Sequence, residues 1–351
     1  MSVYLTLWLV LYCLVGTVAV RAIPHRVTAV IGTMAFGFFA VFRGDVGSDT
    51  VGVYQGTARI LSSGGFGASH MEPGFRALLY AFVRWTDSPQ LAVSGIALVF
   101  TALLLAFAVR AYKAESWYLF ALFIPALFFQ LGFNGERIGI ACAVLLLSAQ
   151  CYRLGQTRLS KVLFWGSLLF QYSSLVVLAY TLLVESKMRT RRFILTSLAT
   201  LCAVTVFAYF AHAYVLAKYM LYVLSGYQSP GPLSGLSQIA IVAIILAGLR
   251  YFRLEPQVRR RMLWVTTALC VTFWGISQYS YAGLRLLDLV AFALPYSLLR
   301  AMAKGDAMFT SRAKLVFVLA GFVGAAFYFR NMLLEPAGAQ SPFIPYHFIW
   351  Q

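Results

Sequence analysis

The sequence predicts an all-α polytopic membrane protein with about 11–12 transmembrane segments. Three observations lead to this prediction. Apolar residues make up 61% of the chain and charged residues 11%, and the mean hydropathy is +0.79. Apolar runs of bilayer-crossing length recur along most of the sequence. Most Lys and Arg residues fall in short connections that can share one side of the membrane.

The expected segments belong to a single membrane-embedded domain over residues 1–351. In chain order they cover 3–20, 27–42, 90–109, 116–132, 138–152, 162–170, 174–184, 193–213, 236–249, 262–279, 284–299 and 315–329. The first lacks a preceding basic region, so we expect it to be retained, with the N-terminus outside.

The segment 162–184 is expected to enter and leave the bilayer on the same side. Basic residues precede it at Arg153, Arg158 and Lys161 and follow it at Lys187, Arg189, Arg191 and Arg192. Both clusters favour the cytoplasm. We therefore expect a hairpin of two short helices, 162–170 and 174–184, around a non-helical tip. Such a tip requires surrounding protein or a watery cavity, which would open away from the cytoplasm.

The formal charge of +17 indicates topology rather than a nucleic-acid partner, because the basic excess lies in the inner connections. All five cysteines lie within or at the ends of expected spans, so no disulfide framework is predicted. No metal-ligand spacing is present either. We expect neither a metal nor a cofactor.

Three segments are expected on the outer, periplasmic side. Residues 43–89 form a glycine-rich loop, in which apolar residues at helical spacing over 74–85 predict an interfacial helix that starts at Pro73. Residues 214–235 form a second, turn-rich loop. Residues 331–351 form a tail that lies back over the outer face.

Arginine dominates the cations expected near this outer face. Its planar fork suits phosphate and diphosphate oxygens. We favour such a role for Arg43, Arg137 and Arg285. For other outer arginines a headgroup contact is an equal alternative: Arg59, Arg84 and Arg330.

Carboxylates accompany these arginines. Asp49 and Glu72 are the first candidates for a general base, with Asp45 and Glu136 behind them. Structural alternatives stay open: an Arg43–Asp pair could close its loop, Glu72 could cap the helix after Pro73, and Glu136 could sit on its helix dipole beside Arg137.

Further polar groups are candidates for substrate contacts. His70 could orient or share a proton, or be solvated. Asp288 lies three residues after Arg285, where it could form an intrahelical salt bridge or hold Arg285 toward the cavity. The hairpin tip offers sugar-binding groups that could equally satisfy the broken backbone: Gln171, Tyr172, Ser173 and Ser174.

Taken together, these segments resemble the EpsG/Wzy-like family of bacterial polysaccharide polymerases. The matching motifs occur in the family's order over nearly the whole chain: FRGDVGSDTVGVY, EPGF, R-x-x-I-A from Arg137, FQYSS, the outer-end Arg285 and PYHF. The chain departs from the family pattern at Ile138, where Gln is frequent, and at Gln171, where His is frequent. Tyr54 and Tyr346, which lie within these motifs, join the expected substrate-binding residues.

The resemblance implies a glycosyltransferase with a GT-C-like helical bundle in the bacterial inner membrane. Its donor and acceptor would be undecaprenyl-diphosphate-linked oligosaccharides, joined at the periplasmic face within the membrane lipid. A chain-length regulator and a flippase of the same pathway are expected partners. The alternatives are an O-antigen ligase or other lipid-linked-sugar glycosyltransferase, and a transporter of lipid-linked glycans.

Overall fold

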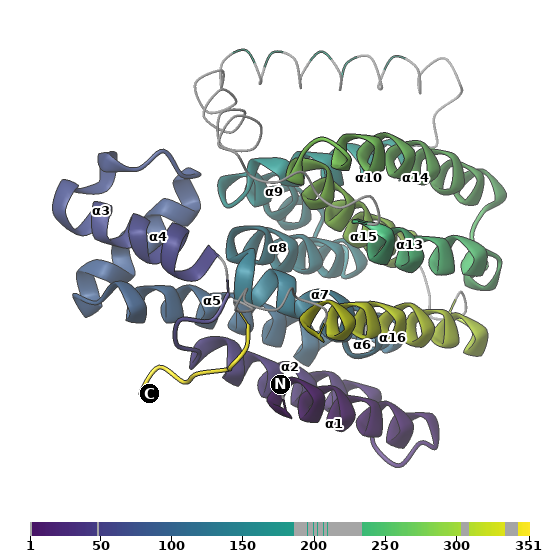
Figure 1. Cartoon of the computed structure of the whole chain (residues 1–351). Helices are drawn as coiled ribbons and strands as arrows, with labels where there is room; N and C mark the ends of the chain where they lie inside the picture. The colour runs from purple at the N-terminus through teal and green to yellow at the C-terminus, as the bar shows by residue number, and fades with distance from the viewer. Residues whose placement is uncertain are drawn as a thin grey trace.

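The computed structural model describes residues 2–47, 49–185, 234–302, 309–333 and 343–351, and the isolated residues Leu195, Ala199, Cys202, Val206 and Tyr209. Every regular element in this part of the chain is a helix (Figure 1). The described residues contain one isolated β-bridge, between Arg43 and Phe348. The predicted all-α class is therefore confirmed.

The longer helices are α1 (Ser2–Ala19), α2 (His25–Val41), α5 (Pro89–Arg110), α8 (Glu136–Arg153), α14 (Pro256–Ser277), α15 (Tyr281–Ala301) and α16 (Ser311–Leu333). The shorter α-helices are α3 (Gly56–Gly64), α4 (Pro73–Thr86), α6 (Lys113–Tyr118), α7 (Ile124–Phe129), α9 (Thr157–Gly166), α10 (Leu175–Glu185) and α13 (Leu236–Gly248). Within the described ranges, the π-helical segments are η1 (Thr50–Gln55), η3 (Leu119–Phe123) and η4 (Gln130–Asn134). The 3-10 turns are η2 (Phe66–Ala68), η5 (Ser167–Leu169), η6 (Tyr172–Ser174) and η8 (Leu249–Phe252).

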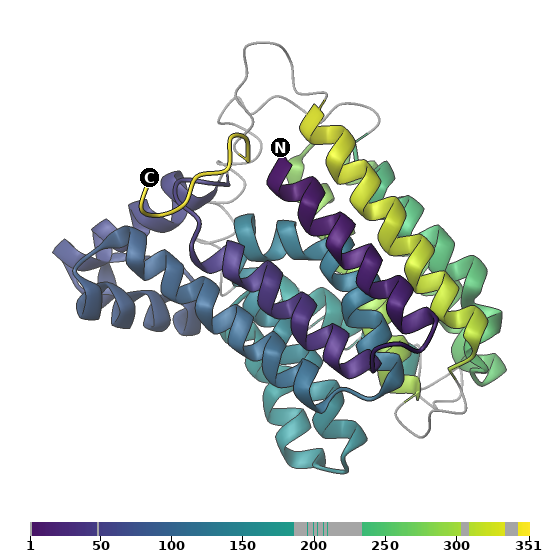
Figure 2. The same ribbon diagram turned by 90° about the horizontal axis from the view of Figure 1, so that it is seen from below.

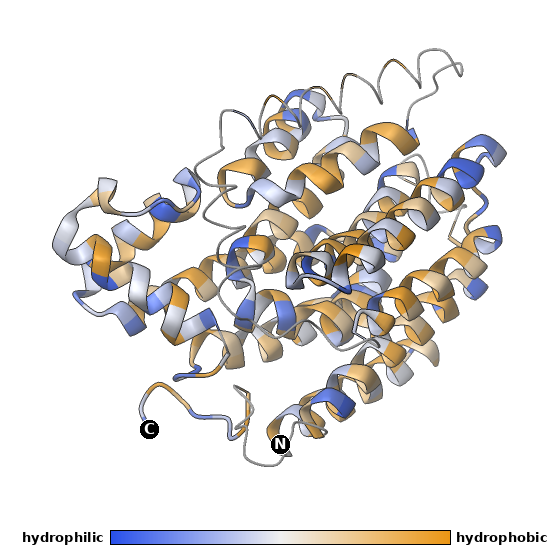
Figure 3. Cartoon of the chain, turned by 45° about the horizontal axis from the view of Figure 1, so that its top comes forward, coloured by the Kyte–Doolittle hydropathy of each residue, from blue (hydrophilic) through white to orange (hydrophobic). Residues whose placement is uncertain are grey.

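Four helical stretches among the described residues are long and apolar enough to cross a membrane: Pro89–Arg110, Lys113–Asn134, Tyr281–Ala301 and Ser311–Leu333. Shorter apolar helices cover Val3–Ala19, His25–Val41, Tyr172–Glu185 and Leu236–Phe252. Hydrophobic residues run along most of the helices, and hydrophilic residues gather near their ends (Figure 3). The chain is thus a multi-pass membrane protein. The span expected at 193–213 and the loop expected at 214–235 lie almost entirely outside the described residues.

Small residues allow the central helices to approach closely. A Cβ added at Gly321 of α16 would overlap the carbonyl oxygen of Ala121 in η3, and one at Gly324 would overlap Ala126. On its other side α16 lies beside α1 (Figure 2). The two helices are in contact through Tyr12 and Phe322, whose ring centroids lie 5.8 Å apart. Close backbone approach of this kind gains packing energy where lipid supplies no hydrophobic drive.

The expected hairpin is present. The helix breaks at Gln171, whose backbone is extended (φ −157°, ψ 117°). Before the break, α9 packs against α8, where Ser148 and Ser160 exchange hydrogen bonds. After the break, α10 ends at Glu185, which forms an ion pair with Arg300. The Arg300 guanidinium also lies 4.5 Å from the ring centroid of Tyr152 at the end of α8, so both ends of the hairpin lie together.

These contacts belong to one end of the bundle, which we call the basic end. It gathers cations from several connections: Arg26, Arg110, Lys113, Arg153, Arg300 and Lys314. Glu115 also lies at this end, and its carboxylate accepts a hydrogen bond from Arg153 at 3.0 Å. The lobe formed by α3 and α4 lies away from this end, next to the C-terminal segment (Figure 1).

The 43–89 segment is more helical than the sequence predicted. The helix expected at 74–85 is present as α4, with Pro73 in its first turn. However, η1 and α3 occupy 50–64, where a loop was expected. Tyr54, Ala58 and Leu61 are fully buried at helical spacing, and this periodicity could have indicated the extra helix. The C-terminal segment then pairs with the start of this region: the N–H of Gly44 donates to the carbonyl of His347 at 2.7 Å.

Candidate functional site

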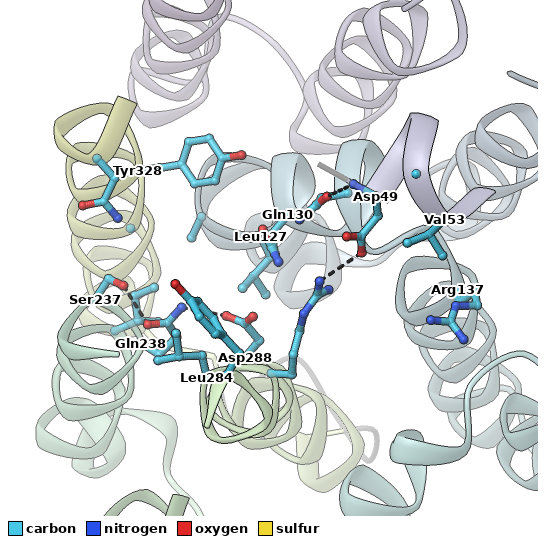
Figure 4. Close-up of a pocket in the computed structure, with 18 residues that line it drawn as sticks. Asp49, Val53, Leu127, Gln130, Arg137, Ser237, Gln238, Leu284, Asp288 and Tyr328 are labelled. Carbon is cyan, nitrogen blue, oxygen red and sulfur yellow. Dashed lines mark hydrogen bonds and ion pairs between the residues drawn. The ribbon is translucent and has the colours of Figure 1, made fainter. Parts of the chain in front are cut away.

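A cavity of about 710 Å³ lies between the segment that starts at Asp49 and helices α7, α8, α13, α15 and α16 (Figure 4). Four charged side chains line it: Asp49, Arg137, Arg285 and Asp288. Uncharged polar residues complete its polar lining: Gln130, Asn134, Ser237, Gln238, Tyr281, Tyr328 and Asn331. Apolar groups such as Leu127 and Ile241 form the remainder. The cavity thus brings together four of the predicted site residues from three distant parts of the sequence.

Arg285 and Asp49 form an ion pair within the cavity. The Nη2 of Arg285 lies 3.0 Å from Oδ2 of Asp49, and the two side chains are 28% and 21% exposed. The backbone N–H of Asp49 donates to Oδ1 of Asn134 at 2.9 Å, which fixes the start of η1 (Figure 4). The pair therefore joins α15 to the N-terminal third of the chain, and both members remain accessible from the cavity.

Arg137 forms a second ion pair, with Glu72. The Nη1 of Arg137 lies 2.8 Å from Oε2 of Glu72. Arg137 is 13% exposed and lines the cavity, whereas Glu72 is fully buried behind it. Glu72 occupies the position before α4 but makes no side-chain cap hydrogen bond. The capping alternative for Glu72 is therefore wrong, and the carboxylate orients a cavity arginine instead.

Arg43 lies outside the cavity lining. Its guanidinium is 1% exposed, forms an ion pair with the fully buried Glu136, and donates to the carbonyls of Ala40 at 2.8 Å and Gly132 at 2.9 Å. The alternative in which an aspartate pairs with Arg43 to close its loop is wrong. Asp45 instead accepts a hydrogen bond from Gln55 Nε2 at 2.8 Å.

One local alternative considered from the sequence is present, and one is wrong. Glu136 lies in the first turn of α8 beside Arg137, as its structural alternative required, and the two side chains take separate partners from distant elements. The intrahelical salt bridge between Arg285 and Asp288 is wrong, because Arg285 pairs with Asp49, and Asp288 accepts from Nε2 of Gln238 at 2.8 Å.

Several other predicted residues lie outside this cavity. His70 is exposed. Tyr346 donates to the carbonyl of Phe39 at 2.8 Å, and Tyr54 is 1% exposed. Burial raises the pKa of Tyr54 to about 12. The structure therefore ties these two tyrosines into packing rather than presenting them to this cavity.

The hairpin tip does not line the cavity either, which differs from the expected position of the opening. Gln171 is buried and donates to Oγ of Ser173 at 2.9 Å. Leu169, just before the tip, lies close to Gly74 of α4. A Cβ added to Gly74 would lie 2.9 Å from the carbonyl oxygen of Leu169. Tyr172 lies within electrostatic range of Glu72 and Arg76. The tip thus supports α4 and the Glu72–Arg137 pair from behind.

Sequence reasoning missed the uncharged polar lining. Gln130 and Asn134 stand four residues apart in an otherwise apolar run, which places them on one helix face and could have indicated them. Ser237 and Gln238 begin α13 directly after a turn-rich segment, and no sequence pattern sets them apart. Within the described residues, no group of three or more His, Cys, Asp or Glu side chains could hold a metal ion.

The fold and the site define a multi-pass helical membrane protein whose polar cavity presents two arginines and two aspartates. The sequence model of the EpsG family matches residues 26–348, so the chain belongs to the EpsG family. EpsG proteins are Wzy-like polysaccharide polymerases, which places the chain in polysaccharide biosynthesis. Neither a curated protein nor a solved structure matches the chain.

Proposed function

We propose that this protein joins undecaprenyl-diphosphate-linked oligosaccharide repeats at the periplasmic face of the bacterial inner membrane. The observation that carries the proposal is that Arg137 and Arg285, on different helices, open on one cavity and are each held by a carboxylate. A pair of oriented guanidinium groups is suited to a ligand with two adjacent phosphates.

The chemistry requires such a site. The bond between the anomeric carbon of the donor sugar and the diphosphate breaks in this reaction. Negative charge develops on the diphosphate oxygen that was bonded to that carbon. Fixed guanidinium groups stabilise this charge without a metal. A guanidinium has five N–H donors, so one arginine side chain can bind a carboxylate and phosphate oxygens at the same time. In this proposal Arg43 is a positioning residue: it holds Glu136 beneath Arg137 at the start of α8.

The cavity also suits the sugars of such a substrate. Amide groups of Gln130 and Asn134 and the hydroxyl of Tyr281 can bind sugar hydroxyls. We infer a single displacement: an acceptor hydroxyl attacks the anomeric carbon while the diphosphate departs, with inversion of configuration.

Sidedness rests on the charge distribution. The basic end carries arginines and lysines from several connections, and the cavity arginines lie away from it. Because Lys and Arg concentrate in cytoplasmic connections, the basic end is assigned to the cytoplasm and the cavity to the periplasmic side.

The test is polymerisation by the purified protein in lipid nanodiscs. Lipid-linked repeats extracted from the source bacterium after deletion of this polymerase serve as substrate. A ladder of longer glycans is expected with the wild type, both with and without EDTA. Arg285→Ala is expected to abolish the ladder, while Arg59→Ala, which removes an exposed arginine of α3 outside the cavity, leaves it unchanged.

Other outcomes identify the alternatives. Transfer of single repeats to a lipid A core without a ladder would indicate a ligase. Movement of lipid-linked repeats across the bilayer without any new glycosidic bond would indicate a transporter. Loss of the ladder in EDTA, with recovery on adding a divalent cation, would overturn the proposed metal-free clamp.

A further inference from the structure

Two walls of the cavity differ in chemistry. One wall, near α8 and the start of η1, carries Arg137 and the Arg285–Asp49 pair. The other, formed by α13 and α16, is polar without charge: Ser237, Gln238, Tyr328 and Asn331. Arg137 and Asp49 lie on one side in Figure 4, and Ser237, Gln238 and Tyr328 lie on the other. Asp288 projects between them from α15, on the side of Gln238.

A chain of hydrogen bonds holds Asp288. The hydroxyl of Ser237 donates to Oε1 of Gln238 at 2.7 Å, and Nε2 of Gln238 donates to Oδ1 of Asp288 at 2.8 Å. The serine therefore sets the orientation of the amide, so that its NH₂ group faces the carboxylate. Among the described residues, Oδ2 of Asp288 has no hydrogen-bond partner, and the side chain lines the cavity.

The other carboxylates near the cavity are bound by arginines. Asp49 pairs with Arg285 at 3.0 Å. Glu72 and Glu136 are fully buried behind Arg137 and Arg43. A guanidinium partner stabilises the ionised carboxylate and so makes it a weaker base, whereas the neutral amide that bonds Asp288 stabilises its charge less. Asp288 is therefore the cavity carboxylate best placed to accept a proton.

Position along α15 agrees with this role. Arg285 and Asp288 are three residues apart, so they lie on one helix face with their Cβ atoms roughly 5–6 Å apart. A diphosphate on Arg285 and Arg137 would place the donor's anomeric carbon beside Asp288. A hydroxyl approaching from the α13–α16 wall would then meet that carbon opposite the departing oxygen.

We propose that the α13–α16 wall is the acceptor-sugar subsite and that Asp288 is the catalytic base that takes the proton of the attacking hydroxyl. This inference rests on the proposed function. The acceptor oxygen bonds to the anomeric carbon of the donor sugar, and the bond from that carbon to the diphosphate breaks. The electron pair leaves on the diphosphate, and the hydroxyl proton passes to Oδ2 of Asp288. Gln238 is a positioning residue that holds Oδ1.

The test compares Asp288→Asn with Arg285→Lys in the nanodisc assay. Asp288→Asn keeps the size of the side chain and removes the base, so turnover is expected to fall by about 10²–10⁴-fold. Affinity for undecaprenyl diphosphate and the Tm are expected to stay at wild-type values, because the diphosphate clamp is intact. Arg285→Lys is expected to weaken undecaprenyl diphosphate binding.

Azide supplies the sharper readout, because it is a nucleophile that carries no proton to remove. In Asp288→Asn, azide is expected to attack the anomeric carbon, release the diphosphate and yield a glycosyl azide detectable by mass spectrometry. No such rescue is expected for Arg285→Lys. The role of Asp288 as the base would be refuted by wild-type turnover in Asp288→Asn. It would also be refuted if the inactive variant binds undecaprenyl diphosphate but forms no glycosyl azide.

Two further outcomes are separable. If Asp288→Asn does not fold, Asp288→Glu, which retains a base, is expected to lower kcat with little change in KM; a change confined to KM would refute the proposal. A wild-type protein that forms no glycan ladder counts against the proposed function itself, whatever the variants do.

Discussion

Replacing Arg43 by methionine tests the buried ion pair beneath the cavity. Arg43 and Glu136 are 1% and 0% exposed, so the substitution leaves a carboxylate buried without its partner. It also removes the donors to the carbonyls of Ala40 and Gly132. Breaking a buried pair in this way costs about 3–5 kcal/mol. For a chain of this length, that free energy corresponds to a Tm lowered by roughly 4–7 °C.

The assay is thermal unfolding of the purified protein in detergent, with Glu136→Gln and the double variant completing a cycle. Each single variant is expected to lose stability, and Arg43→Met with Glu136→Gln is expected to recover most of it, because no charge then remains buried. Undecaprenyl diphosphate binding should persist in the double variant. An Arg43→Met protein with unchanged Tm and abolished diphosphate binding would refute this reasoning and place Arg43 in the clamp.

Substitutions at two glycines, each with a second glycine as its control, provide further predictions. Gly47 has φ +104° and a Cβ there would overlap the carbonyl oxygen of Phe133, so Gly47→Ala is expected to lower the Tm and weaken diphosphate binding through Asp49. Gly65→Ala, at φ +75° in open space, carries only the backbone strain of about 1–3 kcal/mol and should leave binding intact; equal behaviour of the two would contradict this account. Gly321→Val is expected to separate α16 from η3 and reduce folded protein in the membrane, measured by fluorescence-detected gel filtration. Gly275→Ala in α14, where nothing lies within 4 Å, is its control and should be neutral.

The sequence predicted the helical class well because its evidence is local. Spans such as Pro89–Arg110 are apolar over a bilayer's thickness and need no partner to be recognised. The hairpin followed from basic residues on both sides of 162–184, since a charge preference for one side acts on each connection separately. The extra helix at 56–64 was missed because the glycines around it suggested turns.

The site was predictable only in part. Arg137, Arg285, Asp49 and Asp288 were identified by residue type and do share the cavity. Their partners were not, because each ion pair joins residues 65 to 236 positions apart. The sequence around Arg43 did not indicate that it would form a buried ion pair with Glu136. The sequence around Asp288 did not indicate that it would accept a hydrogen bond from Gln238.

The sequence by itself therefore determined that this chain spans a membrane many times, where its charges concentrate, and which arginines are candidates for phosphate binding. Only the tertiary structure decided which of those arginines face the cavity and which is buried beneath it. The physical reason is that hydropathy and charge bias act residue by residue along the chain. The pairing of buried charges depends instead on which helices pack together, and in this protein that packing brings Arg285 of α15 to Asp49 in the N-terminal third and Asp288 of α15 to Gln238 of α13.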